Sequence, residues 1–325
     1  MKVFITGGGG FIGYRLAKAI LLGGQLAGAD GKPQAVSQVT LFDAAFPPNM
    51  DPRVKCVTGD VSSPAAIAAA LDQDTGSVFH LAAVVSGGAE ADFDLGMKVN
   101  LDGCRVLIEA CRKLARAPRF VLASSVAAFG GDLPEVLDDS TTPNPQTSYG
   151  AQKVISEYLV TDYSRKGFVD GRSLRLPTVV VRPGKPNLAA SSFASGIIRE
   201  PLNGQVSECP VGEDTGVWLL SPGKVVKNFI HAHDLPSTSW GSTRVVNLPG
   251  ISASVKEMVA AMGRIAGAPA AARVKWKPEA RIQAIVRTWP VRFRTERALA
   301  MGFQADTDIE SVIRDYIRDE RISLL

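Results

Sequence analysis

Three residues in the middle of the chain could together move a proton to or from a hydroxyl group. Tyr149 and Lys153 are four residues apart in a helical pattern, so their side chains share one helix face. A positive charge beside a phenol favours the phenolate, which can act as a general base. Ser125 follows a strand-like run, where its hydroxyl could hydrogen-bond the same reacting oxygen. We predict a catalytic group of Ser125, Tyr149 and Lys153.

The same four-residue spacing also occurs near the N-terminus, at Tyr14 and Lys18. No substrate pocket is predicted beside that pair, and we interpret it as a chance arrangement on a solvated helix face. Context distinguishes Tyr149, because Ser125 follows the predicted strand 120–123 and ligands of parallel sheets lie beyond the carboxyl ends of strands. The alternative is that these residues are ordinary turn and helix-surface positions.

A glycine-rich turn between the first predicted strand and helix could hold a pyrophosphate. The run satisfies both GxGxxG and GxxGxxG, through Gly7, Gly8, Gly10 and Gly13. Glycines let the backbone approach a phosphate closely, and the helix N-terminus adds unpaired N–H groups and a favourable dipole. The strand–turn–helix context of a dinucleotide site is present as well. The alternative is a glycine turn in an α/β protein that binds no nucleotide.

Two aspartates could contact the adenosine half of such a nucleotide. Asp43 ends the second predicted strand, where a carboxylate accepts hydrogen bonds from ribose hydroxyls and repels a 2′-phosphate. This position predicts NAD rather than NADP. Asp60 lies in the turn after the third strand, placed to meet the adenine amino group. The alternatives are a turn aspartate at a strand end for Asp43 and a helix cap beside Ser62 for Asp60.

These positions require a sheet whose strands end at one edge, and the hydrophobic pattern predicts such a sheet. Buried strands are predicted at 2–6, 39–42, 54–57, 78–81, 120–123 and 173–181. Helices are predicted at 11–22, 64–71, 94–114 and 148–163. Continuous apolar strands separated by helices indicate an α/β fold, a Rossmann-type doubly wound parallel sheet. Residues 23–37 show no clear period, and we expect an extended surface loop there.

The alternation of predicted strands and helices stops at about residue 182, where prolines and glycines become frequent. We predict an NAD-binding Rossmann domain over 1–181, to which a segment near 229–249 returns. A smaller C-terminal substrate-binding lobe would consist of 182–228 and 250–325. A chain of 325 residues is long enough for both.

Composition and charge exclude several classes of protein. The net charge of +4 comes from scattered basic residues, so no nucleic acid is expected as a partner. No apolar run approaches the ~18 residues that indicate a membrane span. Four cysteines without a CxxC pair favour a reducing compartment, and we expect a cytoplasmic protein. The denser arginines are interpreted as a solvated face: Arg287, Arg292, Arg294 and Arg297.

A short histidine-rich run could suggest a metal site. His231, His233 and Asp234 have a permissive spacing, but no further ligand cluster accompanies them. We therefore predict a structural role for this run and no metal.

The chain resembles the extended short-chain dehydrogenase/reductases, also called the NAD-dependent epimerase/dehydratase family, over essentially its whole length. The motifs that carry the resemblance are TGGGGFIG at 6–13, GDV at 59–61, HLAA at 80–83, the S–YxxxK set, LRLPTVVVRPG at 174–184 and NFIHAHDLP at 228–236. The resemblance implies NAD as cofactor and a homodimer, with Asn100 in a helix at the subunit interface. It implies these cofactor-binding residues: Gly7, Gly10, Phe11, Ile12, Gly13, Asp43, Asp60, Val61, Leu81, Ala82, Ala83, Asn100, Tyr149, Lys153, Pro177 and Thr178.

Within that family, the runs at 82–103, 177–204 and 218–236 are similar to sugar-acid enzymes that act on D-erythronate. This similarity implies NAD-dependent oxidation of the C2 hydroxyl of D-erythronate, a four-carbon aldonate, to 2-oxo-tetronate. Arg182 is the candidate for the substrate carboxylate, since a guanidinium matches carboxylate geometry, and Lys185 is second. The alternative for either is a surface charge. The implied substrate-binding residues are Ser86, Ser125, Tyr149, Arg182 and Ser192.

Three alternative functions are compatible with the predicted fold. A nucleoside-diphosphate-sugar 4-epimerase uses the same catalytic group, but its nucleotide pocket would need a basic and aromatic cluster that residues 180–230 do not show. A nucleotide-sugar dehydratase would need an Asp–Glu pair after the serine, where this chain has Val126 and Ala127. A non-catalytic NAD-sensing protein would tend to lack the catalytic tyrosine or lysine. This chain has both Tyr149 and Lys153, which argues against that function.

Overall fold

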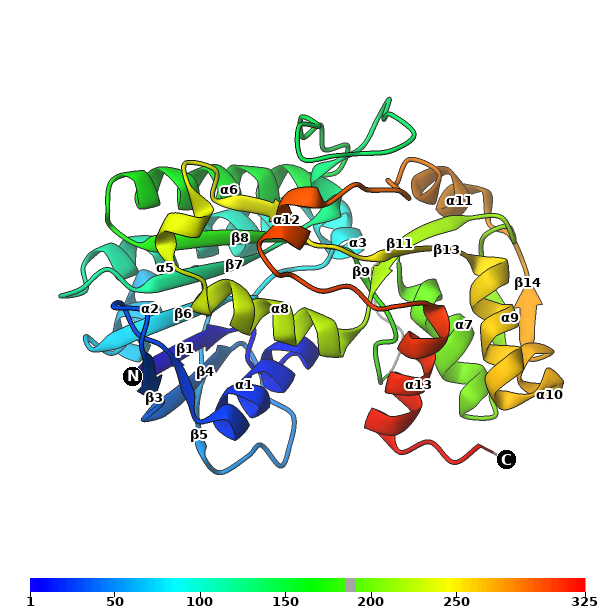
Figure 1. Ribbon diagram of the computed structural model, residues 1–325, viewed down its shortest axis with the longest axis horizontal. Helices are drawn as coiled ribbons and strands as arrows, with labels where there is room; N and C mark the ends of the chain where they lie inside the picture. The colour runs from blue at the N-terminus through cyan, green and yellow to red at the C-terminus, as the bar shows by residue number, and fades with distance from the viewer. Residues whose placement is uncertain (185–190, 325) are drawn as a thin grey trace. The chain divides into compact units, whose positions relative to one another are not determined.

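The computed structural model describes residues 1–184 and 191–324 and divides the chain into two compact units (Figure 1). Unit 1 comprises Met1–Ala128, Thr147–Arg175 and Val226–Asn247. Unit 2 comprises Phe129–Gln146 and the described residues of Leu176–Val225 and Leu248–Leu325. The segment Phe129–Gln146, predicted as part of the first domain, thus clusters with unit 2.

Unit 1 is built on a seven-stranded sheet with the order β12-β8-β7-β6-β1-β4-β5. Its strands are β1 (Lys2–Thr6), β4 (Gln38–Asp43), β5 (Val54–Thr58), β6 (Thr75–His80), β7 (Arg119–Ser125), β8 (Asp170–Leu176) and β12 (Val245–Asn247). The order reverses at β1, which pairs in parallel with both β4 and β6. Such a reversal opens a crevice at the carboxyl ends of the strands. The predicted Rossmann-type α/β class is confirmed.

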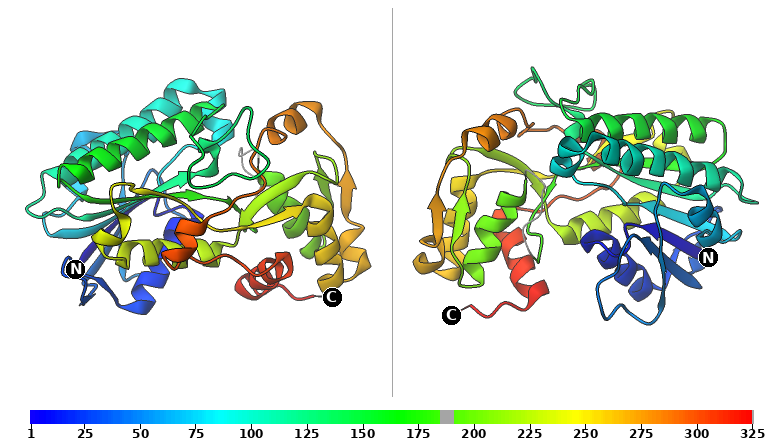
Figure 2. Two further views of the ribbon diagram at one scale, coloured as in Figure 1. Left: turned by 45° about the horizontal axis from the view of Figure 1, so that its top comes forward. Right: turned by 180° about the vertical axis from the view of Figure 1, so that it is seen from behind.

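Helices cover both faces of this sheet (Figure 2). They are α1 (Phe11–Gly23), α2 (Pro64–Ala70), α3 (Ser86–Ala91), α4 (Phe93–Gly96), α5 (Gly103–Arg112), α6 (Ser148–Arg165) and the C-terminal part of α8 (Pro222–Asp234). On one face, Phe4, Val78 and Phe120 of the sheet pack with Leu107 of α5 and Val160 of α6. On the other face lie α1 and α8.

Two predicted elements are interrupted in the structure. The helix predicted over 94–114 is divided by a π-helical turn, η1 (Met97–Asp102), which joins α4 to α5. The strand predicted over 173–181 ends as β8 at Leu176, and β9 (Thr178–Val179) then pairs with β11 (Gly216–Leu220) in unit 2. Pro177 separates the two strands, and a proline has no N–H with which to continue a ladder.

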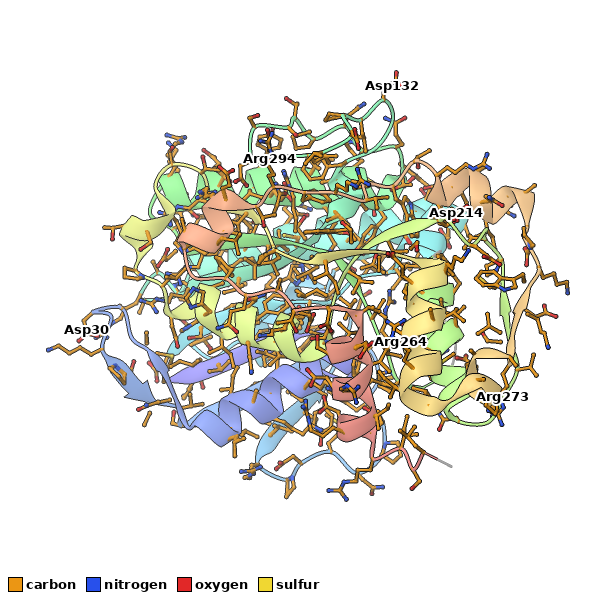
Figure 3. The ribbon with its side chains drawn as sticks, turned by 45° about the vertical axis from the view of Figure 1, so that its right-hand side comes forward. Asp30, Asp132, Asp214, Arg264, Arg273 and Arg294 are labelled. Atoms are coloured by element: carbon orange, nitrogen blue, oxygen red, sulfur yellow. The ribbon has the colours of Figure 1, made fainter. Side chains whose placement is uncertain are left out.

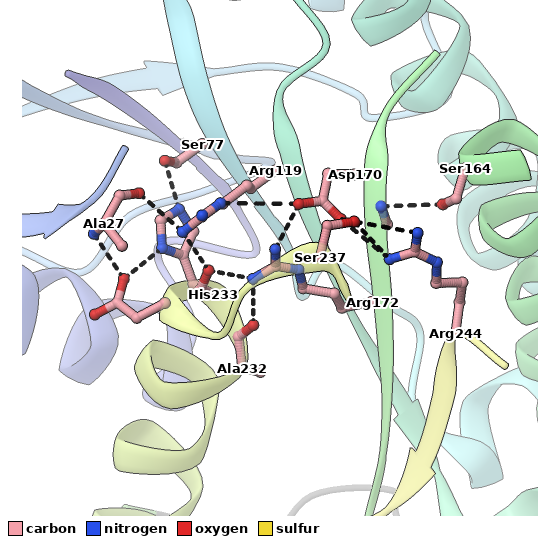
Figure 4. Close-up of polar contacts among 12 residues, drawn as sticks. Ala27, Ser77, Arg119, Ser164, Asp170, Arg172, Ala232, His233, Ser237 and Arg244 are labelled. Carbon is pink, nitrogen blue, oxygen red and sulfur yellow. Dashed lines mark hydrogen bonds and ion pairs between the residues drawn. The ribbon is translucent and has the colours of Figure 1, made fainter. Parts of the chain in front are cut away.

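Residues 23–37 were expected to be a loop but form an antiparallel hairpin, β2 (Gln25–Ala27) and β3 (Pro33–Ala35). Asp30, labelled in Figure 3, lies at its tip. The Ala27 N–H donates to Asp234 Oδ1 at 2.8 Å, and Arg119 Nη1 donates to the Ala27 carbonyl at 2.9 Å (Figure 4). The hairpin is therefore held by residues that are far away in the sequence. The local sequence pattern at 23–37 does not reveal such contacts.

Two buried arginines cap the C-terminal end of α8 (Figure 4). Arg119 donates to the carbonyl of His233, and Arg172 donates to the carbonyls of His233 and Ala232. Cations at this end of a helix satisfy unpaired carbonyls and oppose the negative pole of the dipole. Asp170 supplies the countercharge through an ion pair with Arg172. The run that suggested a metal site thus has a structural role at the end of α8.

Acidification is expected to destabilise unit 1, because two buried histidines stay neutral when folded. Burial lowers the pKa of His80 to about 3 and also lowers that of His233, whose ring contacts Ser77 Oγ and Asp234. Below the ordinary histidine pKa of 6.5 the unfolded chain binds protons that the folded chain does not, so the free energy of unfolding decreases as the pH is lowered. At about pH 5 His80 alone would cost about 2 kcal/mol.

Thermal melts at pH values between about 7 and 5 test this expectation. The melting temperature should fall steadily as the pH is lowered. His80→Asn removes one titrating ring and should make the slope of melting temperature against pH shallower. A slope that is unchanged in this variant would contradict the assignment of His80 as a neutral buried group.

Unit 2 contains smaller sheets packed with helices. Its three-stranded sheet has the order β13-β11-β9, with β13 (Ile251–Ser254), and its two-stranded sheet joins β10 (Ser207–Cys209) to β14 (Val274–Trp276). The helices are α7 (Ser192–Leu202), α9 (Val255–Ala266), α10 (Ala268–Ala271), α11 (Ala280–Val286), α12 (Glu296–Ala300) and α13 (Ile309–Glu320). Arg264 of α9, labelled in Figure 3, pairs with Glu310 of α13 at 2.7 Å.

Candidate active site

The glycine turn between β1 and α1 is shaped by close backbone contacts. Gly7 has a φ of +70°, and the Gly10 N–H donates to its carbonyl at 3.1 Å. A Cβ on Gly13 would lie 2.2 Å from the Gly7 carbonyl oxygen, and one on Gly9 would lie 2.3 Å from that of Ala45. No side chain of the described residues caps the N-terminus of α1. The first turn of α1 therefore presents N–H groups that no side chain caps, as an anion site requires.

A cavity of about 860 Å³ lies in unit 1 against this turn. Volumes of this size are typical of cofactor sites. The predicted cofactor residues that line it are Gly7, Gly10, Asp43, Asp60, Val61, Leu81, Ala82 and Ala83. It is also lined by residues that were not predicted: Gly9, Phe42, Ala44, Ala45, Gly59, Val84, Leu95, Lys98 and Val99.

Asp43 lies at the carboxyl end of β4, where its carboxylate accepts hydrogen bonds from two backbone N–H groups. Gly9 N donates to Oδ2 at 3.0 Å, and Ala44 N donates to Oδ1 at 2.7 Å. The side chain is thereby fixed beside the glycine turn.

Asp60 occupies the turn after β5, and a lysine that was not predicted lies beside it. Lys98 Nζ of η1 is 2.8 Å from Asp60 Oδ2, and Ser62 donates to Oδ1 from its N–H and hydroxyl. The hydrogen bonds from Lys98 and Ser62 hold the pKa of Asp60 at about 2, so the carboxylate is ionised. Ser63, rather than Asp60, caps α2. Lys98 was missed because its position depends on the π-helical turn, which has no pattern of its own.

Asn100 is buried, and it binds the loop that follows β6. Its Oδ1 accepts from Val84 N at 2.7 Å, and its Nδ2 donates to the Val84 carbonyl at 3.1 Å. Nδ2 also donates to Gln152 Oε1, next to Lys153 on α6. Asn100 is therefore placed to hold the cavity-lining loop in register with α6.

Tyr149 and Lys153 lie in the first two turns of α6, which Thr147 caps by accepting from Gly150 N. Lys153 is 2% exposed, and its Nζ lies 5.5 Å from the centroid of the Tyr149 ring. Ser125 ends β7, and its hydroxyl oxygen accepts from a backbone N–H at 3.1 Å. All three predicted catalytic residues belong to unit 1, which also holds the cavity.

The second pair, Tyr14 and Lys18, has a similar geometry on α1. Lys18 Nζ lies 4.7 Å from the Tyr14 ring centroid. The Tyr14 hydroxyl, however, accepts from Asp51 N at 2.9 Å and so fastens a loop. Neither this pair nor Tyr149 and Lys153 lines the cavity. The two pairs differ in the burial of the lysine, because Lys18 is exposed whereas Lys153 is buried.

The predicted substrate residues are divided between the units. Ser86 begins α3 in unit 1, whereas Ser192 begins α7 in unit 2. Arg182 belongs to unit 2, where its Nε donates to the Val179 carbonyl at 3.1 Å and its Nη2 donates to Ser191 Oγ at 2.8 Å. Lys185 lies outside the described residues.

The predicted cofactor residues that do not line the cavity are Phe11, Ile12, Gly13, Asn100, Tyr149, Lys153, Pro177 and Thr178. Phe11 and Ile12 begin α1, and Pro177 and Thr178 belong to unit 2. The described residues contain no group of His, Cys, Asp or Glu that could hold a metal ion. None of the helices in residues 1–184 and 191–324 is long and apolar enough to cross a membrane.

Comparison with known proteins agrees with this arrangement. The chain is 56% identical over 320 residues to a D-erythronate dehydrogenase of Cupriavidus necator, covering 98% of each chain. It is 45% identical to a D-erythronate dehydrogenase of Haemophilus influenzae, covering 98% of this chain and 99% of that one. The crystal structure of a nucleoside-diphosphate-sugar epimerase from Agrobacterium tumefaciens has a TM-score of 0.93 and 39% identity, covering 100% of this chain and 96% of that chain.

The family model of the NAD-dependent epimerase/dehydratases matches residues 3–240. This range contains the glycine turn, the cavity and the three predicted catalytic residues. The chain therefore belongs to the NAD-dependent epimerase/dehydratase family, and its cofactor is NAD.

Proposed function

We propose that this protein is an NAD-dependent dehydrogenase that oxidises the C2 hydroxyl of D-erythronate to give 2-oxo-tetronate. The observation that supports the chemistry is the Tyr149–Lys153 pair on α6, whose lysine is buried, whereas the lysine of the Tyr14–Lys18 pair in the same unit is exposed. The choice of substrate is supported by full-length similarity to two D-erythronate dehydrogenases.

The residues of the cavity fit NAD. The glycine turn forms a cradle that a Cβ would fill, and the free N-terminus of α1 suits a pyrophosphate. The ionised Asp60 and the fixed Asp43 carboxylate would hold the adenosine half. When bound, NAD supplies the hydride acceptor for the oxidation.

The chain's own residues would move the proton. Tyr149, as phenolate, takes the proton of the substrate hydroxyl. The buried Lys153 ammonium stabilises the negative charge on the phenolate oxygen. The Ser125 hydroxyl forms a hydrogen bond with the reacting oxygen. This bond orients the proton of the substrate hydroxyl toward Tyr149. Ser86 and Ser192 would contact the substrate hydroxyls.

Arg182 would bind the substrate carboxylate. Its guanidinium is already oriented by the Val179 carbonyl and by Ser191, which lowers the entropy lost on binding. Replacing Arg182 by leucine should raise KM for D-erythronate by about 10–100-fold, since a hydrogen bond to a charged group contributes about 1.5–3 kcal/mol. Steady-state kinetics with each substrate varied in turn measure this effect. An equal rise in KM for NAD would show a general distortion instead.

Asp43 would select NAD over NADP. Asp43→Asn keeps the shape of the side chain but removes the charge that repels a 2′-phosphate. We expect the ratio of kcat/KM for NAD to that for NADP to fall by about 10-fold or more, equivalent to about 1.4 kcal/mol. Asp60→Asn is the matched control and should leave this ratio unchanged. If both variants change the ratio equally, Asp43 has no special role.

The proposed activity is tested by following NADH formation with purified protein and a set of four- and five-carbon aldonates. UDP- and dTDP-sugars serve as controls. NADH formation that is fastest with D-erythronate supports the proposal. Interconversion of nucleotide sugars without net NADH would overturn it and make the protein an epimerase.

We also propose a homodimer that works in the cytoplasm in carbohydrate metabolism. Two large apolar side chains of α6 are exposed, Ile155 at 44% and Tyr158 at 69%, which supports burial against a second copy. All four cysteines are free, as a reducing compartment allows. Light scattering of the purified protein tests the dimer.

A further inference from the structure

A buried carboxylate on α6 takes no part in the mechanism above. Glu157 follows Lys153 by one helical turn and Tyr149 by two, so the three side chains share a helix face. Glu157 is only 3% exposed. Its Oε1 accepts from the Ser124 hydroxyl at 2.5 Å and from Arg175 Nε at 2.9 Å, and its Oε2 accepts from Arg175 Nη2 at 2.7 Å.

This network joins three elements of unit 1. Glu157 lies on α6, Ser124 near the carboxyl end of β7, and Arg175 near that of β8. Arg175 supplies the countercharge that a buried carboxylate needs, and Asn247 of β12 contacts its Nη1 at 3.4 Å. Three hydrogen bonds thus hold the buried Glu157 carboxylate between β7 and β8.

The course of the chain shows why such a connection is needed. Ser125 ends β7 and Tyr149 is the second residue of α6, but most of the chain between them, Phe129–Gln146, belongs to unit 2. The relative position of the serine and the tyrosine therefore depends on non-covalent contacts between β7 and α6. Apolar packing across this boundary, as at Val160, is not directional. The bond from Ser124 to Glu157 is directional and lies one residue from Ser125.

We propose that Glu157 is a positioning residue for the reaction. By holding the Ser124 hydroxyl, it sets the end of β7 against α6 and so places Ser125 relative to Tyr149. Misplacement of reacting groups by about 1 Å can lower a rate by about 100-fold, so a remote hydrogen bond can control kcat. This inference rests on the proposed function, because it assumes that Ser125 and Tyr149 act on one oxygen.

The test is a double-mutant cycle of Ser124→Ala and Ser125→Ala. Ser124→Ala removes the hydroxyl and leaves the ion pair between Glu157 and Arg175 intact. In the wild-type background it should lower kcat by about 10–100-fold, with KM for NAD unchanged. In the Ser125→Ala background it should have almost no further effect, because the residue that it positions is gone. A merely structural role would lower kcat by the same factor in both backgrounds.

Thr161→Val is the matched control. The Thr161 hydroxyl donates to the Glu157 carbonyl at 2.8 Å within α6 and contacts no part of β7 in the hydrogen bonds of the described chain. Its loss should leave kcat unchanged. An unchanged kcat in Ser124→Ala, or additive effects in the cycle, would overturn the role of Glu157.

Failure of this inference can be separated from failure of the proposed function. Wild-type activity on D-erythronate tests the function alone. If the wild type interconverts nucleotide sugars instead, the same cycle is measured on that reaction, since it uses the same three catalytic residues. If neither reaction occurs, crystal structures of the wild type and of Ser124→Ala decide, and an unmoved Ser125 hydroxyl would contradict the inference.

Discussion

Replacing Tyr149 by phenylalanine is expected to lower kcat for D-erythronate oxidation by about 10²–10⁴-fold, the usual contribution of a general base. The variant loses only the hydroxyl that takes the substrate proton. Its ring would still lie beside the Lys153 ammonium, as the wild-type ring does at 5.5 Å from centroid to Nζ. The dissociation constant for NAD should therefore change little. Single-turnover NADH formation measures the chemical step, and calorimetric titration with NAD measures binding.

The chain contains its own control for this experiment. Tyr14→Phe makes the same change in the other YxxxK pair, where Lys18 lies at a similar distance from the ring. Here the lost hydroxyl only accepts a hydrogen bond from Asp51 N, so stability should fall by about 1 kcal/mol and kcat should stay the same. A loss of activity in both variants would point to general damage, and a fully active Tyr149→Phe would exclude the proposed base.

The positions of Ser125, Tyr149 and Lys153 in the fold were predictable because they depend on residue type and local spacing. A helix places Tyr149 and Lys153 on one face wherever it lies, and the carboxyl ends of parallel strands define one edge of the sheet for Ser125. The glycine turn was predictable for a similar reason, since few side chains tolerate its backbone contacts. In each case the chemistry restricts the local sequence strongly.

The hairpin of residues 23–37 and the position of Lys98 depend on distant contacts. Ala27 is 92 residues from Arg119 and 207 residues from Asp234, the two partners that hold the hairpin. Lys98 reaches Asp60 from a π-helical turn that interrupts an otherwise continuous helical pattern. Tertiary packing decides such features, and a single sequence contains no local signal for them.

Gly13→Ala is expected to weaken NAD binding severely. The added Cβ would lie 2.2 Å from the carbonyl oxygen of Gly7 and 2.9 Å from its carbonyl carbon, and both are backbone atoms that cannot turn aside. Relief requires the glycine turn to move away from α1, and this turn lines the cavity. We expect the dissociation constant for NAD to rise by about 100-fold or more, equivalent to about 2.7 kcal/mol. Calorimetric titration of the folded variant measures the change.

Gly23→Ala separates a local clash from the general effect of a methyl group on α1. Gly23 is the last residue of the same helix, and a Cβ there would meet no atom within 4 Å. Because alanine has less backbone freedom to lose on folding, this variant should be more stable by about 0.4–1 kcal/mol and should bind NAD as the wild type does. Wild-type affinity in Gly13→Ala would mean that the close contact of turn and helix is not needed for the cofactor. Weak binding in both variants would mean that any change in α1 disturbs the site, whereas weak binding in Gly13→Ala alone locates the requirement at the turn.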